Sequence, residues 1–331
     1  MTLPWHQGLW QQLIARRRQD ALPHALLLAG APGLGKAHLA AALARSLVCE
    51  TPDDSGRGCG RCRACRLHSA GTHPDLLCIA PPERGKALQV EQVRAITRFL
   101  SLTPQQAQGR VVTLLEADSM TLQAANALLK TLEEPPGAAR LLLVSARPGR
   151  LPATLRSRCQ RLLFTAPPLA QGLDWLRAQV TGRPDELSAA LKLAGGAPLL
   201  ARRYLEQDRL AHCDALLAQL EALAWGDATP ERMAQALLKL ALHDTLQWMY
   251  AWVADLLRIQ AGGQTRHVKA QHQLGRLQTL AGAASPRGLF HLLARLETMS
   301  QPALNSLNAA LVLEDLLITW QRCFGQGAPR T

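Results

Sequence analysis

The sequence predicts an α/β domain followed by an all-helical region, on three observations. An apolar run at 25–28 leads through a glycine-rich loop into an alanine-rich helical stretch. Strand patterns and helical patterns then alternate up to about residue 165, and beyond it leucines and alanines recur only at helical spacing. Strands that alternate with helices are typical of a mostly parallel sheet covered on both faces.

The elements of the first domain can be placed along the chain from their apolar patterns. A short arginine-rich helix at 10–19 precedes the first strand, and the helix after the glycine loop ends near Cys49. We expect strands at 25–28, 76–80, 111–115, 141–145 and 161–164, and later helices at 90–100 and 126–134. The last helix must end there because two prolines follow it, and proline lacks the N–H that a helix needs.

The sequence predicts three domains. Pro167 and Pro168 mark the end of the α/β domain, which we assign to 1–165. A small helical unit is expected at 166–205 and a larger helical domain at 206–331. A polar stretch rich in glycine and cysteine interrupts the first domain at about 49–72, and we interpret it as an inserted module.

Composition and charge narrow the class of protein. Hydrophobic residues make up 48% of the 331 residues, but no apolar run approaches the ~20 residues that a membrane span needs. The N-terminus lacks the cationic and apolar segments of a secretory signal, so a cytoplasmic protein is expected. The net charge of +12 favours an anionic partner such as nucleic acid. Because aromatic residues are only 4%, contact with a nucleic-acid backbone is a better expectation than base stacking.

Residues 30–36 read GAPGLGK and match the GxxxxGK pattern of a P-loop. Gly30, Gly33 and Gly35 would let backbone N–H groups approach phosphate oxygens, and Lys36 would add positive charge. The strand before the loop and the helix after it are the context that this motif needs. A serine or threonine normally follows the lysine and holds Mg²⁺, but here the next residue is Ala37. The sequence leaves open whether ATP or ADP still binds.

The second P-loop element is an apolar strand that ends in acidic residues, and here it is also incomplete. The strand at 111–115 leads into Glu116, Ala117 and Asp118. Glu116 could approach a metal ion through water, but Ala117 stands where a carboxylate would activate the attacking water. Asp118 is displaced by one residue. Two of the parts that phosphoryl transfer requires are therefore missing, which predicts little or no ATP hydrolysis.

Four cysteines with the spacing C-x9-C-x2-C-x2-C predict a metal site. They are Cys49, Cys59, Cys62 and Cys65. Four thiolates suit tetrahedral Zn²⁺, and a site without an open position is structural rather than catalytic. Either Cys78 or His68 could replace Cys49 as the fourth ligand, and an iron–sulfur cluster is the alternative to zinc.

Six motifs in this order resemble the bacterial clamp-loader subunits of the AAA+ superfamily, which have a RecA-like P-loop domain. The match is dense over roughly 20–165 and weaker beyond, where 304–317 resembles the family's C-terminal segment. The motifs are Leu22-Pro23-His24-Ala25, the P-loop, the four-cysteine insert, Gly71-Thr72-His73-Pro74-Asp75, the segment 126–136 and Ser157-Arg158-Cys159.

Two kinds of subunit in the DNA polymerase III clamp loader share this layout, the tau/gamma motor and a subunit that does not hydrolyse ATP. The motor has a hydroxyl residue where this chain has Ala37 and a glutamate where it has Ala117. A motor lid arginine also aligns with Leu199, although Arg202 lies one turn later. These departures favour the non-hydrolysing kind. The resemblance also implies that 166–205 is a helical lid and that 206–331 is a collar through which subunits oligomerise.

The resemblance implies a role in trans and a set of partners. Arg158 would act as an arginine finger toward ATP on a neighbouring motor subunit. The implied partners are the tau/gamma and delta subunits, the sliding clamp and primer–template DNA, in a hetero-oligomer with no membrane contact. Two other functions remain open from the sequence. One is an active AAA+ ATPase of the tau/gamma type, and the other is a zinc-dependent nucleic-acid-binding module, suggested by the charge and the arginine-rich segment 57–66.

Overall fold

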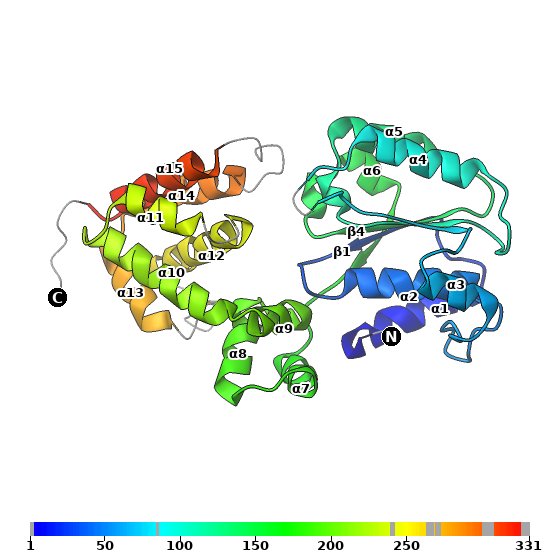
Figure 1. Cartoon of the computed structure of the whole chain (residues 1–331), viewed down its shortest axis with the longest axis horizontal. Coiled ribbons are helices and arrows are strands. Elements are labelled where there is room, and N and C mark those ends of the chain that lie inside the picture. The colour runs from blue at the N-terminus through cyan, green and yellow to red at the C-terminus, as the bar shows by residue number, and fades with distance from the viewer. Residues whose placement is uncertain are drawn as a thin grey trace. The chain divides into compact units, whose positions relative to one another are not determined.

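The computed structural model describes residues 3–83, 86–238, 242–262, 268, 273–299 and 308–325. The chain divides into two compact units, Met1–Pro167 and Pro168–Thr331, which are described separately (Figure 1). The start of the C-terminal segment that resembles the clamp-loader family, Leu304 and Asn305, lies outside the described residues.

The first unit is built on five parallel strands in the order β2-β3-β4-β1-β5, which confirms the predicted α/β sheet. Every residue of the interior strand β1 is buried, and its register pairs Ala25 with Leu141 of β4. A strand covered on both faces needs an unbroken apolar run, and β1 has one. The strands are β1 (Ala25–Ala29), β2 (Leu76–Ile79), β3 (Val111–Leu114), β4 (Arg140–Ser145) and β5 (Gln160–Leu163).

Helices cover both faces of this sheet. Figure 1 shows α1, α2 and α3 on one side and α4, α5 and α6 on the other. The predicted helix at 126–134 begins earlier, at Leu122, because the hydroxyl of Thr121 accepts a hydrogen bond from the backbone N–H of Ala124 and caps it. The helices are α1 (Gln7–Arg18), α2 (Lys36–Val48), α3 (Arg63–Ser69), α4 (Val90–Ser101), α5 (Leu122–Glu133) and α6 (Ala153–Ser157), with 3-10 turns η1 (Pro4–His6), η2 (Ala117–Ser119) and η3 (Pro148–Arg150).

A buried aspartate just before the edge strand β2 holds the segment 105–107 in place. The carboxylate of Asp75 is fully buried and accepts hydrogen bonds of 2.7–2.9 Å from the backbone N–H groups of Gln105, Gln106 and Ala107. The guanidinium of Arg110 lies 3.8 Å away. Burial raises the pKa of this carboxyl, but the three N–H groups and Arg110 outweigh it, so the pKa of Asp75 lies below its ordinary value.

Replacing Asp75 with asparagine should lower the free energy of unfolding by about 2–3 kcal/mol at pH 7, because an amide cannot replace a charged acceptor of three N–H groups. A carboxyl with a depressed folded pKa stabilises the protein above its unfolded pKa of ~3.9, and this contribution is lost as the pH falls through the folded value. The difference between the two proteins in urea unfolding should therefore shrink below about pH 4. If the difference in unfolding free energy between the two proteins did not change with pH, the charge of Asp75 would not be what stabilises this part of the fold.

The second unit is helical in all the elements that the structure describes, as predicted. One small core includes Leu176, Leu191 and Tyr204, and a larger one centres on the buried Trp252 and Trp320. The helices are α7 (Leu169–Gln179), α8 (Pro184–Leu193), α9 (Pro198–Glu206), α10 (Arg209–Ala224), α11 (Pro230–Leu237), α12 (Leu242–Gln260), α13 (Leu274–Ala283), α14 (Pro286–Met299) and α15 (Ala309–Arg322). Within the described residues, no helix combines the length and the apolar character that crossing a membrane would require.

Candidate functional site

The four predicted metal ligands lie together. The Sγ atoms of Cys49, Cys59, Cys62 and Cys65 are all within 4.8 Å of one another, and those of Cys49 and Cys62 are 3.9 Å apart. Four sulfurs at ~2.3 Å from one tetrahedral ion would be separated by ~3.8 Å. The cluster therefore fits a single metal ion with four thiolate ligands.

Helix ends and backbone hydrogen bonds on both sides of the insert position these four sulfurs close together. Cys49 is the C-cap of α2 and Cys62 is the N-cap of α3, whose Sγ accepts the backbone N–H of Cys65 at 3.4 Å. The sulfur of Cys49 accepts the N–H of Cys59, and the sulfur of Cys59 accepts that of Cys62. Such N–H groups orient thiolates and stabilise their negative charge. The first ligand thus ties the insert to the P-loop helix.

One side chain that supports the cluster was not predicted from the sequence. Burial raises the pKa of the Cys65 thiol, and the side chain of Arg45, on α2, opposes this effect most strongly. It also passes so close to Gly58 and Gly60 that a Cβ atom at either would lie 2.7 Å from it. A cationic neighbour offsets part of the charge of four thiolates. Only the spacing of Arg45, four residues before Cys49, could have suggested this role.

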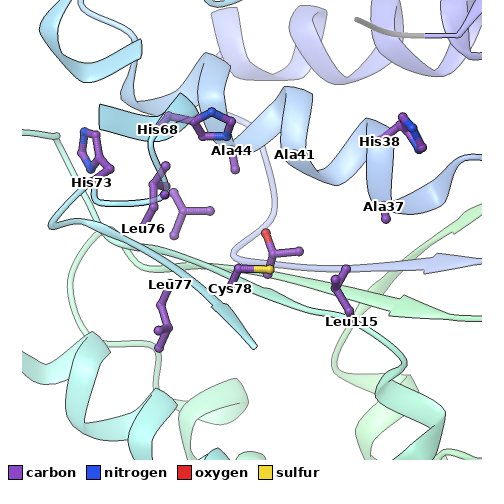
Figure 2. Close-up of a pocket in the computed structure, with 13 residues that line it drawn as sticks. Ala37, His38, Ala41, Ala44, His68, His73, Leu76, Leu77, Cys78 and Leu115 are labelled. Carbon is purple, nitrogen blue, oxygen red and sulfur yellow. The ribbon is translucent and has the colours of Figure 1, made fainter. Parts of the chain in front are cut away.

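The two alternative fourth ligands lie elsewhere. His68 and Cys78 are outside the cluster and line a cavity between α2 and the strands β2 and β3 (Figure 2). Because Cys49 completes the cluster, neither residue is needed as a fourth ligand.

The P-loop connects β1 to α2, as its motif predicts. Gly35 has φ +84°, and a Cβ there would lie 2.3 Å from Leu3, while a Cβ on Gly30 would lie 2.4 Å from the carbonyl oxygen of Phe164. Gly33 also has a left-handed φ, +75°. Glycine is therefore required by the conformation of the loop and by the backbone packed against it. These requirements hold whether or not a nucleotide binds.

Lys36 is turned into its own loop. Its side chain is only 6% exposed, and Nζ donates hydrogen bonds of 2.7 Å to the carbonyls of Gly30 and Ala31. Burial lowers its pKa to about 8, partly opposed by the negative charge of Asp118. The ammonium thus contacts the two carbonyls where a P-loop lysine would contact phosphate oxygens.

The N-terminal segment braces the loop, a contact that the sequence motifs did not predict. Trp5 donates from Nε1 to the carbonyl of Leu34 at 3.0 Å, and the same oxygen lies 2.7 Å from Nε2 of His6. The ring of His6 also packs edge-on against Phe164, with centroids 5.3 Å apart. Burial is the main reason that the pKa of His6 is lowered, so the ring is neutral and its Nε2–H donates to the carbonyl.

The two acidic residues after β3, Glu116 and Asp118, have different surroundings. Asp118 is buried, and its carboxylate accepts the backbone N–H of Ala146 at 2.9 Å and pairs with Arg147 at 3.5 Å. It therefore ties η2 to the end of β4. Glu116 has a left-handed backbone, with φ +50°, and the side chain of Ala117 is buried. The carboxylate whose charge acts on Lys36 is that of Asp118.

Arg158 lies where α6 meets the end of α5. It is the C-cap of α6, and Nη1 donates to the carbonyl of Thr154 at 2.8 Å. Its Nη2 forms an ion pair with Glu133 at 2.5 Å. The side chain remains 36% exposed. Glu133 is a partner that the sequence analysis did not identify.

Arg202, the arginine one turn after the Leu199 position, is engaged within its own helical unit. Leu199 is in the first turn of α9, whereas Arg202 pairs with Glu206 at 3.1 Å and lies 6.0 Å from the ring of Trp175.

Comparison with known proteins gives consistent matches along both units. The family model described as DNA polymerase III, delta subunit, matches residues 5–168, and the model for the C-terminal part of the delta subunit matches 206–322. A gamma-subunit-related protein of DNA polymerase III from Thermotoga maritima has a TM-score of 0.44 and 19% identity, covering 95% of this chain and all of that one.

Curated relatives match over nearly the whole length. The DNA polymerase III subunit delta' of Pseudomonas aeruginosa is 36% identical and covers 98% of both chains, and that of Yersinia pestis is 36% identical over 99% of this chain and 98% of its own. The Escherichia coli subunit delta' is 35% identical over 95% of this chain and 94% of its own. These relatives confirm the resemblance to a bacterial clamp-loader subunit that the motifs indicated. The chain belongs to the DNA polymerase III subunit delta' family.

Proposed function

We propose that this chain is a non-hydrolysing clamp-loader subunit that acts in the cytoplasm with tau/gamma and delta subunits to load the sliding clamp onto primed DNA. The observation that carries the proposal is a P-loop without its catalytic partners. Ala37 offers no oxygen to Mg²⁺, and Ala117 offers no carboxylate to water. Asp118 is held by Ala146 and Arg147, and Lys36 by the carbonyls of its own loop. Both Lys36 and Asp118 are therefore engaged in contacts within their own domain.

The proposed contribution to catalysis is the guanidinium of Arg158, supplied to ATP on a neighbouring motor subunit. An arginine finger offsets the charge that develops as the γ-phosphate leaves. The partial exposure of Arg158 and its fork of N–H donors suit this role. Its ion pair with Glu133 is on the protein surface, where such pairs contribute little, so a phosphate oxygen could replace the carboxylate at small cost. In this proposal Glu133 orients the finger until ATP arrives.

We further propose that the four-cysteine cluster holds structural Zn²⁺ and that the second unit comprises a lid, 166–205, and an oligomerising collar, 206–331. An all-thiolate tetrahedral site is typical of structural zinc. The two separate cores of the second unit support its division into lid and collar.

The isolated chain should not turn over ATP above background, since neither a metal-ligating hydroxyl nor a water-activating carboxylate is present. The measurement is steady-state phosphate release at saturating ATP and Mg²⁺, with the Lys36→Ala variant as the matched control. Any residual rate should be the same in both proteins, as expected of a contaminant. Turnover that disappears with Lys36→Ala would instead favour an active ATPase of the tau/gamma type.

The assignment to a clamp loader is tested by reconstitution. Mixing this chain with tau/gamma and delta subunits of the same bacterium should give a stable complex whose ATPase is stimulated by clamp and primed DNA. Sequence-specific DNA binding by the chain alone, with no complex formed, would favour a zinc-dependent nucleic-acid-binding module.

A further inference from the structure

The residue before β1 lies where the two helices that carry Glu133 and Arg158 return to the sheet. β1 is between β4 and β5, and its register pairs Leu26 with Leu142 of β4 and with Gln160 of β5. The helix α5 leads into β4, and α6 leads into β5. The backbone carbonyl of His24 accepts the N–H of Leu141 at 2.7 Å. The main chain of His24 is therefore fixed at the edge of the sheet that the ends of α5 and α6 approach.

The last turn of α5 has backbone carbonyls that the helix itself cannot satisfy. In an α-helix the carbonyl of each residue accepts the N–H of the residue four positions later. The carbonyls of Thr131 and Leu132 would need N–H groups from Pro135 and Pro136, and proline has none. Such carbonyls at a helix end need donors from elsewhere in the protein or from water.

His24 supplies the donor for one of these carbonyls. Its Nε2 lies 3.0 Å from the carbonyl oxygen of Leu132, a residue 108 positions later in the chain. A carbonyl oxygen only accepts hydrogen bonds, so Nε2 carries the ring proton and donates it. Thr131, the preceding residue, has a separate contact, since its hydroxyl lies 3.2 Å from that of Thr97 on α4. The imidazole thus ties the last turn of α5 to the sheet.

The last turn of α5 also carries the partner of Arg158. Glu133 follows Leu132, is the final residue of α5, and pairs with Nη2 of Arg158 at 2.5 Å. The two side chains are 48% and 36% exposed, so water competes for the ion pair and the attraction between the charges alone is weak. The pair forms reliably only where the backbone presents the carboxylate at the right place. The bond from His24 acts on that backbone one residue away.

We propose that His24 is a positioning residue for Arg158. By donating to the carbonyl of Leu132, it fixes the last turn of α5, and this turn places the carboxylate of Glu133 that orients the guanidinium. The effect on ATP hydrolysis rests on the arginine finger proposed above, whereas the arrangement of these side chains within the chain does not. The inference also connects two of the sequence motifs, because the prolines after Glu134 remove the N–H groups and His24 replaces one of them.

The arrangement is tested on the full chain alone, with phenylglyoxal as an arginine reagent and peptide mass mapping of the modified sites. Loss of the ion pair should make Arg158 up to about fivefold more reactive in His24→Ala, as in Glu133→Gln, which removes the pair directly. His24→Gln keeps an N–H donor at the place of Nε2 and should leave Arg158 as protected as in the unmodified chain. His24→Asn has its amide at the place of Nδ1, too short to reach the carbonyl, and should not protect it.

Two controls separate positioning from general loosening of the domain. Thr97→Val removes the neighbouring hydrogen bond of α5 without touching the carbonyl of Leu132, and it should leave the reactivity of Arg158 unchanged. Arg156 is exposed on the same helix as Arg158 and should react equally in every variant. Because His24→Gln and His24→Asn are both polar and uncharged, the comparison between them stands even where His24→Ala lowers the stability of the fold.

The functional consequence is measured by single-turnover hydrolysis at the neighbouring motor site of the reconstituted complex. His24→Ala should lower the rate up to about fivefold, and His24→Gln should restore it. In a chain that already carries Glu133→Gln or Arg158→Ala, His24→Ala should cause no further loss, because residues that act through one another are not additive.

Three results would overturn the proposal: a reactivity of Arg158 that does not change in His24→Ala, equal protection by His24→Asn and His24→Gln, or a rise in Thr97→Val as large as in His24→Ala. Losses of rate from His24→Ala and Glu133→Gln that multiply would also overturn it. Normal hydrolysis with Arg158→Ala would remove the arginine finger from the proposed function. The expected reactivities of Arg158 would still show, in that case, that His24 positions its side chain.

Discussion

Replacing Arg158 with alanine should lower ATP hydrolysis at the neighbouring motor site by about 10³-fold or more, the loss typical of a missing arginine finger. The total clamp- and DNA-stimulated rate of the reconstituted complex should fall less, because its other ATP sites do not depend on this residue. Arg158→Lys should recover little, since a point ammonium cannot reproduce a planar fork of donors. Single-turnover hydrolysis in the assembled complex separates the affected site from the others.

The matched control is Arg156→Ala. This residue is two positions earlier on α6 and exposed, so its removal takes away the same charge from the same helix. It should leave hydrolysis and clamp loading nearly unchanged. Glu133→Gln tests the ion pair separately, and an orienting role predicts a change of only a few-fold, because exposed ion pairs contribute ~0–1 kcal/mol. A complex with Arg158→Ala that hydrolyses ATP and loads clamps normally would leave this chain as a scaffold.

The sequence predicted the parts of the fold that depend on local patterns. The unbroken apolar run of β1 predicted a strand buried on both faces, and the loop GAPGLGK predicted a strand before it and a helix after it. The spacing of the four cysteines predicted the cluster because its ligands lie near one another in sequence. Helix starts were less predictable, since the cap of α5 depends on one threonine hydroxyl.

Contacts between distant segments could not be predicted in this way. The ion pair of Arg158 joins two helix ends. The hydrogen bonds that Trp5 and His6 make to Leu34 of the P-loop span 29 and 28 positions of the sequence. The empty space beside α2 also has no sequence signature, because alanine in a helix is ordinarily read as a good helix former. Only the folded chain brings His68 and His73 to the lining of one cavity.

Replacing Cys62 with serine should reduce bound zinc from one equivalent to well below half, because the cluster would lose one of its four thiolates. The matched control is Cys78→Ser, which removes an exposed thiol outside the cluster and should leave the zinc content unchanged. Elemental analysis of protein purified without added metal measures the zinc content of both variants. Less than half an equivalent in the unmodified chain, or loss of metal from Cys78→Ser, would contradict this assignment.

The structural consequence of losing the metal should be large but local. Zinc-dependent peptides gain ~10–16 kcal/mol from the ion because they have little other core, whereas the sheet of this unit has its own buried core. Three of the four ligands lie inside the insert at about 49–72, so Cys62→Ser should expose the insert to proteolysis while the sheet stays intact. Cys49→Ser should extend the cleavage beyond the insert, because Cys49 is the C-cap of α2 and its loss also frees the end of the P-loop helix. Limited proteolysis with mass mapping distinguishes the two variants, and cleavage spread evenly over the first unit would mean that the metal supports the whole domain.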